Sequence, residues 1–390
     1  LDEAIRLMRQ AYRDAPEDPD VAGLYAALVV DRASQEGFAV IERVASDFPT
    51  YAHVPLTNAV SAPAQRDSAR NQRYLARLAE IQPEKECEEL QFGELIHDGK
   101  VEEARRRLTR CKLLHGSDDG AFLSSLTLGA IEIDALEPAR ARDAVSPLLG
   151  DPRDYVRTEA VRLTIASQVL GGEIDAALVA LESEVTRLVD QENPRVALQR
   201  AASAVRIAGL TGRTPSKALL ERVEALLAQP LGMPPAAGHR VRAFVLRADP
   251  AASPARMKET IDALLASDQV GDRFYALPLL RRTRGDLEAV RVIAHAEPAT
   301  RARVLHALEV AILLERTGAL DASIDAHYRL AMTPIAVDLT GFDKIAARVR
   351  LAARLEKRGE KEEAGRLRAE VARAWANADP GLEKIALELK

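Results

Sequence analysis

Residues that stop helices recur along this chain at a nearly constant spacing. Pro ends or kinks a helix because it lacks an N–H donor and collides with the preceding turn, and Gly readily takes the left-handed conformation that closes a helix. Stops separated by 33, 34, 33, 36, 42 and 36 residues lie at Pro16, Pro49, Pro83, Gly116, Pro152, Pro194 and Pro230, and later ones at Pro298, Pro334 and Pro380. This spacing predicts a tandem array of units of about 34 residues.

A second, softer break divides most units into two helical stretches. It falls at Asp98-Gly99, Gly171-Gly172, Gly212, Gly318 and Gly359. Each unit is therefore expected to be two helices, which must lie antiparallel because the turn between them is short. Ala, Leu, Arg and Glu dominate the sequence and favour helices, whereas the β-branched and aromatic runs typical of strands are almost missing. The pattern predicts an all-α fold.

Composition excludes several classes of protein. The chain has 390 residues, of which 47% are hydrophobic, and a formal net charge of −5, which is too balanced and too apolar for a disordered chain. No apolar run approaches the roughly 18 residues that a membrane-spanning helix needs. Two Cys do not make a disulfide scaffold, and a pI near 5.9 does not favour nucleic acid. We therefore expect no membrane insertion of this segment and no nucleic-acid partner.

The residues inside the units follow a pattern of large and small side chains. One unit has Phe92-Gly93, Ile96, Ala104 and Leu108, and another has Leu351-Ala352, Leu355, Gly359, Ala364 and Pro380. This pattern resembles the tetratricopeptide repeat, although the units between about 117 and 300 match it poorly. The resemblance implies a right-handed superhelical α-solenoid of stacked antiparallel helix hairpins.

The expected organisation has three parts. Residues 1–229 form an N-terminal solenoid segment, and residues 257–390 form a C-terminal segment that ends in a polar capping hairpin. Residues 230–256 between them contain Pro230, Pro234, Pro235, Pro250 and Pro254. This Pro-rich stretch is either a distorted repeat or a hinge.

The motifs of catalysis and metal binding are not found in the sequence. Cys87, His97, Cys111 and His115 lie within 29 residues. Folding the hairpin about Gly99 would place His97 roughly 15 Å from the two Cys, too far to share one zinc ion. The run Arg281-Arg282-Thr283-Arg284 is interpreted as a solvated helix face. We therefore expect no metal, no cofactor and no enzymatic activity.

Proteins with such repeats bind segments of other proteins on the concave surface that the first helices line. Here the matching positions are Leu90, Glu94 and His97 in one unit and Leu308 and Ile312 in another. The resemblance implies a protein-interaction scaffold within a larger bacterial complex.

Two alternatives stay open: a regulatory sensor arm of a larger kinase or ATPase, and a periplasmic scaffold for export or polysaccharide secretion. The chain reads as part of a longer protein or assembly, and the cytoplasm is favoured slightly over the periplasm. Oxidised Cys87 and Cys111 would favour the periplasm.

Overall fold

All regular structure in the described part of this chain is helical, which confirms the predicted all-α class. None of the described helices is both long enough and apolar enough to cross a membrane. The computed structural model describes residues 2–30, 35–52, 55–56, 59, 68–81, 95–96, 99–114, 118–233, 235–249, 251–267, 270–294, 304–332 and 339–389.

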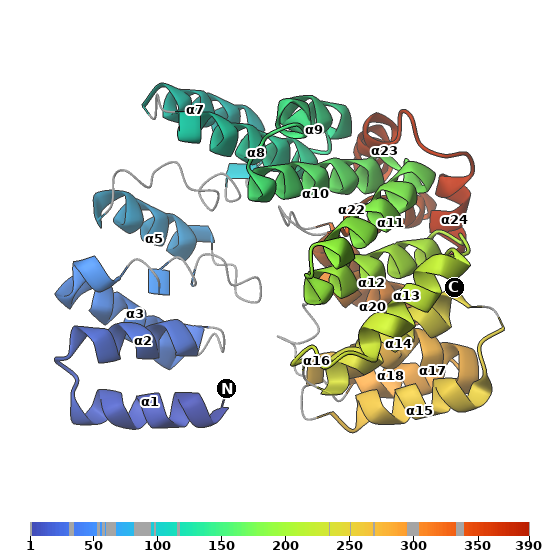
Figure 1. The fold of residues 1–390 in the computed structure, drawn as a ribbon, viewed down its shortest axis with the longest axis horizontal. Helices are drawn as coiled ribbons and strands as arrows, with labels where there is room; N and C mark the ends of the chain where they lie inside the picture. The colour runs from blue at the N-terminus through green and yellow to red at the C-terminus, as the bar shows by residue number, and fades with distance from the viewer. Residues whose placement is uncertain are drawn as a thin grey trace. The chain divides into compact units, whose positions relative to one another are not determined.

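The chain divides into two compact units, Leu1–Ser124 (unit 1) and Ser125–Lys390 (unit 2). Unit 1 contains α1 (Asp2–Asp14), α2 (Pro19–Val30), α3 (Gln35–Asp47), the 3-10 helix η1 (Pro49–Tyr51), α5 (Ser68–Ile81) and α7 (Val101–Leu114). Helix α8 (Asp118–Asp134) crosses the boundary. Within unit 1, α2 packs on both α1 and α3 (Figure 1). Tyr25 and Ile41 are buried in its core, and Tyr25 stacks on Tyr12 with 5.2 Å between the ring centroids.

Unit 2 contains the remaining helices. They are α9 (Pro138–Val145), η4 (Ser146–Leu148), α10 (Asp154–Gly171), α11 (Ile174–Asp190), α12 (Pro194–Leu210), α13 (Lys217–Leu227), α14 (Pro235–Ala248), α15 (Pro254–Leu265), α16 (Val270–Arg273), η5 (Phe274–Ala276), α17 (Leu277–Arg284), α18 (Asp286–Ala294), α20 (Val304–Arg316), α21 (Asp321–Ala331), α22 (Gly341–Lys357), α23 (Lys361–Ala374) and α24 (Leu382–Glu388). The Pro-rich residues 230–256 lie inside this unit, where α14 packs on α12 and α15. The boundary between the two units therefore lies near residue 124, and the hinge at 230–256 stays a prediction.

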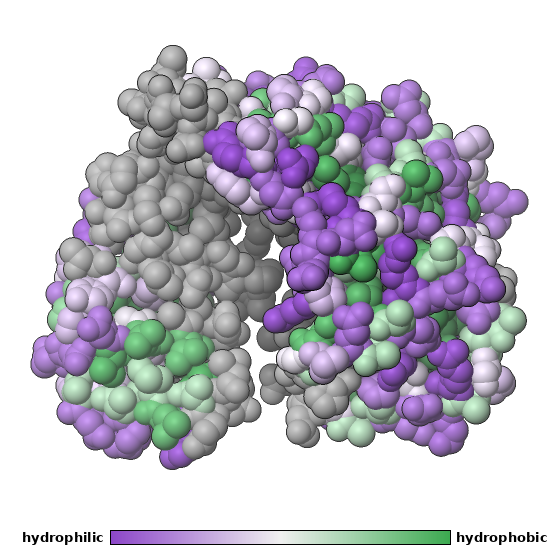
Figure 2. All heavy atoms as spheres, in the orientation of Figure 1, coloured by the Kyte–Doolittle hydropathy of each residue, from purple (hydrophilic) through white to green (hydrophobic). Residues whose placement is uncertain are grey.

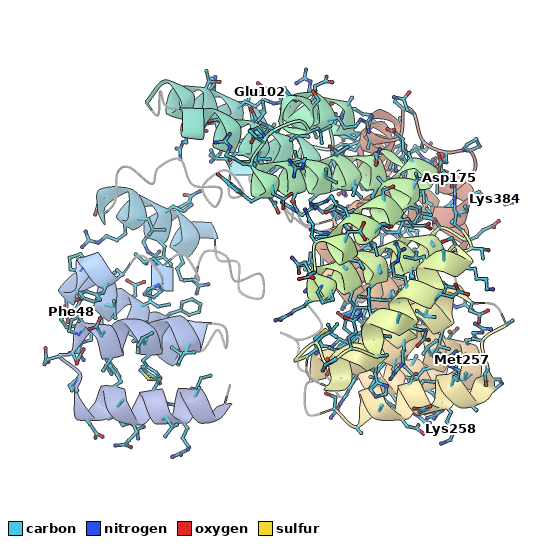
Figure 3. All side chains as sticks on the ribbon, in the orientation of Figure 1. Phe48, Glu102, Asp175, Met257, Lys258 and Lys384 are labelled. Atoms are coloured by element: carbon cyan, nitrogen blue, oxygen red, sulfur yellow. The ribbon has the colours of Figure 1, made fainter. Side chains whose placement is uncertain are left out.

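The predicted breaks coincide with helix ends. Gly99, Gly172, Gly212, Gly318 and Gly359 all have positive φ, between 68° and 85°. At Gly172 the chain closes α10 through hydrogen bonds from Gly172 N to Val169 O and from Glu173 N to Gln168 O. Between the breaks the helices are amphipathic. On α15, for example, Met257 is buried in the core whereas its neighbour Lys258 is exposed (Figure 3).

The C-terminal helices of unit 2 return to its first helices. α22 packs on α10, although the two lie far apart in sequence. The Trp375 indole donates a hydrogen bond to the Leu170 carbonyl at 3.1 Å, and Asp379 N donates to the Gly172 carbonyl at 2.9 Å. We call these two bonds the closing contact. Asp175 N, at the start of α11, donates to the Asp379 carboxylate, and Figure 3 shows Asp175 beside the C-terminal segment.

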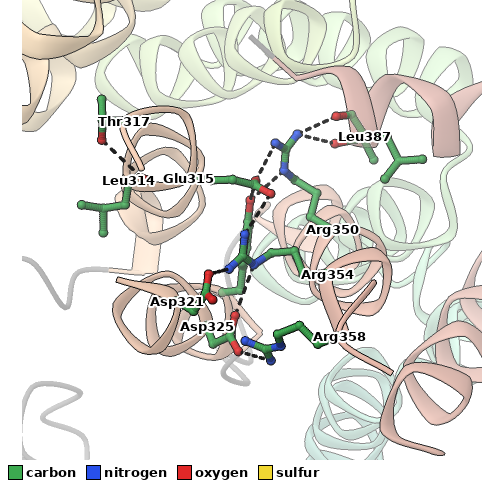
Figure 4. Close-up of polar contacts among 11 residues, drawn as sticks. Leu314, Glu315, Thr317, Asp321, Asp325, Arg350, Arg354, Arg358 and Leu387 are labelled. Atoms are coloured by element: carbon green, nitrogen blue, oxygen red, sulfur yellow. Dashed lines mark hydrogen bonds and ion pairs between the residues drawn. The ribbon is translucent and has the colours of Figure 1, made fainter. Parts of the chain in front are cut away.

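A row of arginines on α22 ties it to its other neighbours (Figure 4). Arg350 pairs with Glu315 of α20 at 2.8 Å and donates to the Leu387 carbonyl of α24. Arg354 and Arg358 bind carboxylates of α21. Most residues of α22 are buried. The hairpin predicted to be a polar, exposed cap thus begins with a central helix of unit 2, because α10, α20, α21, α23 and α24 all pack on it.

Candidate functional site

The five residues that the sequence assigns to partner binding fall into two groups. Leu90, Glu94 and His97 lie outside the described residues. Leu308 and Ile312 lie on α20, and both side chains are buried. In unit 2 these two residues therefore occupy core positions rather than the surface of a groove.

Helix α20, which carries these two residues, packs on α18, α21 and α22. α12 packs on α14, and α22 packs on α10 and α20. Arg206 of α12 donates a hydrogen bond to Asp343 of α22, and Arg247 of α14 pairs with Glu309 of α20. Helices that are distant in sequence are thus joined by ion pairs along the face that the repeat pattern predicts to be an open groove.

Three ion pairs join helices of unit 2 that are distant in sequence: α8 with α22, α12 with α22, and α14 with α20. Lys344 Nζ is 3.1 Å from Asp134 Oδ1, and each side chain is only 2% exposed. Arg206 Nη2 is 2.6 Å from Asp343 Oδ1, and Arg247 forms the third pair with Glu309. Each pair joins segments at least 62 residues apart in sequence. We call the six residues of these pairs the inner charge cluster; they are Asp134, Arg206, Arg247, Glu309, Asp343 and Lys344.

The pKa of Glu309 shows that the pairs compensate for burial. Burial opposes ionisation of this carboxyl, but nearby Arg247, His306 and Arg206 outweigh it and lower the pKa. The group therefore stays a carboxylate at neutral pH. Because every cation of the inner charge cluster has a carboxylate partner, the cluster fixes which helices face each other; an unpaired charge there would be strongly unfavourable.

Metal ligation finds no support among the residues that the structure describes. No group of three or more His, Cys, Asp and Glu side chains in them could hold a metal ion. Cys87, His97 and His115 lie outside the described residues, as does the side chain of Cys111. The expectation of no metal stays a prediction for that part of the chain.

Unit 1 exposes apolar side chains on its first two helices. Leu7 on α1 is 54% exposed and Leu24 on α2 is 59% exposed. Ala4 and Ala11 continue the stripe on α1, and Val21 continues it on α2. On each helix the stripe is rotated about the helix axis away from the core-facing residues, in the same sense on α1 and on α2. Because the two helices are antiparallel, both stripes lie on the same side of the helix pair. Figure 2 shows hydrophobic side chains gathered over α1 and α2. We call this surface the apolar face of α1 and α2.

A cavity in unit 2 was not indicated by the sequence pattern. It has a volume of about 570 Å³ and is lined by residues of α12, α14, α17, α18, α20 and α24. Arg281 contributes to its wall and is only 9% exposed, so the arginine run of α17 is not simply a solvated helix face. The composition of the run gave no sign of this, because Arg281 is buried by helices distant in sequence.

No protein-family model matches the sequence of this chain, and no curated protein is significantly similar to it.

Proposed function

We propose that this chain is a non-enzymatic interaction scaffold, a tetratricopeptide-like right-handed α-solenoid that binds a segment of a protein partner within a larger bacterial complex. The observation that carries this proposal is the exposed apolar face of α1 and α2. Because Leu308 and Ile312, the described groove residues of unit 2, are buried, the binding surface is assigned to unit 1.

The packing of unit 2 indicates what fits such a face. By the repeat pattern, α1 is the second helix of a hairpin and α2 the first helix of the next one. In unit 2, α20 packs on both members of the equivalent pair, α21 and α22, and α14 packs on both α15 and α17. In both cases the covering helix is the first helix of the same hairpin. A partner helix that takes this place on α1 and α2 would carry apolar residues at i, i+3 and i+7 against Leu7 and Leu24.

Site-specific photocrosslinking in the native host tests the proposal. A photoreactive residue at Leu7 or Leu24 should trap the same protein. A residue at Val179, which is 68% exposed in unit 2, is the matched control and should not trap it. Leu24→Asp should abolish trapping from position 7, because a carboxylate in an apolar contact must be desolvated. Equal trapping at positions 7 and 179, or none at positions 7 and 24, would refute the proposed surface.

Of the alternatives, the sensor arm of a larger signalling enzyme is favoured by one observation, the cavity of unit 2, since a regulatory arm needs a place for a ligand. The periplasmic scaffold depends on the redox state of Cys87 and Cys111. Neither side chain lies in the described part of the chain.

A further inference from the structure

The cavity of unit 2 combines a cationic wall with an apolar floor. Its walls carry four guanidinium groups and two carboxylates. The charged lining residues are Arg247, Arg281, Arg282, Arg316, Asp286 and Glu388. Leu210, Leu279 and Leu389 are buried at its apolar side. Its volume of about 570 Å³ falls within the range of roughly 300–1,000 Å³ that is typical of small-molecule sites.

The Asp286 carboxylate binds two of these arginines, each through its Nε atom. Asp286 accepts a hydrogen bond from Arg281 Nε at 3.1 Å and from Arg316 Nε at 2.8 Å. Within the described residues, the terminal nitrogens of these two guanidiniums make no hydrogen bond. Asp286 thus fixes both side chains while leaving the N–H groups that bind oxyanions in pairs available.

The electrostatics at Arg281 favour a further anion. Its pKa is lowered, chiefly by burial and also by the positive charge of Arg316, although Asp286 and Glu309 act in the opposite direction. Arginine nevertheless stays charged at any physiological pH. A further negative group beside Arg281 and Arg316 would therefore be attracted by two guanidinium charges that share the Asp286 carboxylate.

The other lining residues determine what else a ligand of this cavity could contact. Arg247 is engaged with Glu309, and Arg282 donates to the carbonyls of Leu246 and Asp249 at the end of α14. These two therefore shape the wall, whereas Arg281 and Arg316 face the ligand. Ile385 and Leu389, from the last helix and the residue after it, add apolar contact to the lining.

We propose that this cavity is a binding site for a small amphipathic organic anion, whose carboxylate or phosphate group binds Arg281 and Arg316 and whose apolar body lies against Leu210, Leu279, Ile385 and Leu389. The site is independent of the protein-binding surface proposed for unit 1.

Calorimetric titration of the full chain at low salt tests this site. The probes are octanoate and octyl phosphate, which share the apolar body and carry the two head groups, and octyltrimethylammonium, which carries the opposite charge on the same body. At least one anion should bind saturably at one site per chain, and the cation should not. Arg316→Gln, on a side chain that is 44% exposed, should lower the affinity about tenfold by removing a charged hydrogen bond.

Two further variants distinguish a loss of ligand binding from a loss of folding. Ile385→Trp fills the cavity without changing a charge and should also weaken binding, whereas Arg291→Gln, on α18 but outside the lining, should leave it unchanged. Failure of both anions to bind saturably would overturn the inference. Equal binding of the cation, or unchanged binding in both Arg316→Gln and Ile385→Trp, would do the same.

Discussion

The inner charge cluster contains charged side chains that are almost completely removed from solvent, above all Lys344 and Asp134. Lys344 Nζ lies 3.1 Å from Asp134 Oδ1 in the interior, and replacing one of the two residues leaves the other charge buried without this partner. Lys344→Met should therefore lower the free energy of unfolding of unit 2 by about 3–5 kcal/mol. Denaturant titration followed by Trp375 fluorescence measures this. Lys384→Met, at a side chain that is 77% exposed, is the control and should change stability by less than about 0.5 kcal/mol.

The double variant Lys344→Met with Asp134→Leu distinguishes the cost of an uncompensated charge from the cost of lost packing. Because it removes both buried charges, it should recover most of the stability that Lys344→Met loses. If the double variant is as unstable as the sum of the two single variants, the loss comes from packing and not from an uncompensated charge.

Glu315 gives the molecule a predictable response to acid. Burial opposes its ionisation, but hydrogen bonds from Tyr328, Arg350 and Arg354 outweigh burial and lower its pKa from 4.5. A group with a lower pKa in the folded state stabilises the fold above its unfolded pKa, and that stability is lost as the pH falls through the folded value. The free energy of unfolding should thus fall below about pH 4.5, and less steeply in Glu315→Gln. Identical slopes for the two proteins between pH 5 and 3 would contradict this role.

At the scale of elements, the close approach of α22 to α10 depends on Gly341. A Cβ atom at this position would lie 2.7 Å from the Leu170 backbone, closer than real contacts allow. Gly341→Ala should therefore destabilise unit 2 by about 1–3 kcal/mol, although Ala favours helices. Gly365 on α23 is the matched control: its Cβ would meet nothing within 4 Å, and Gly365→Ala should stabilise by about 1 kcal/mol. Thermal unfolding of both variants checks the pair, and equal effects would refute the close approach.

The helices themselves could be read from the sequence, because Gly and Pro act locally. Gly172 and Gly359 end their helices through their own backbone conformation, whatever the positions of the neighbouring helices. Which surfaces these helices bury could not be predicted. Arg354, for example, belongs to the hairpin predicted to be a polar cap, but it pairs with Asp321 and other carboxylates on neighbouring helices. The burial of Leu308 likewise did not follow from its position in the repeat pattern.

At the scale of the whole molecule, the two units have their own cores, so we expect them to respond separately to core mutations. Trp375 is the only Trp and belongs to unit 2. Ile41→Ala removes a buried side chain of unit 1 and should cost about 2–5 kcal/mol there. It should shift the unfolding transition seen by circular dichroism without moving the one seen by Trp375 fluorescence. Ile261→Ala in unit 2 should move the fluorescence transition, and the same shift in both probes for Ile41→Ala would show that the units unfold together.

The closing contact also limits how this protein can change in evolution. An open row of repeats can gain or lose a hairpin by duplication or deletion, since each unit contacts only its neighbours. In unit 2, Trp375 and Asp379 meet Leu170 and Gly172 after the chain has passed through every intervening hairpin. One hairpin more or fewer between α10 and α22 would move these groups out of register. Descendants of this chain should therefore vary in the sequence of their hairpins far more than in their number.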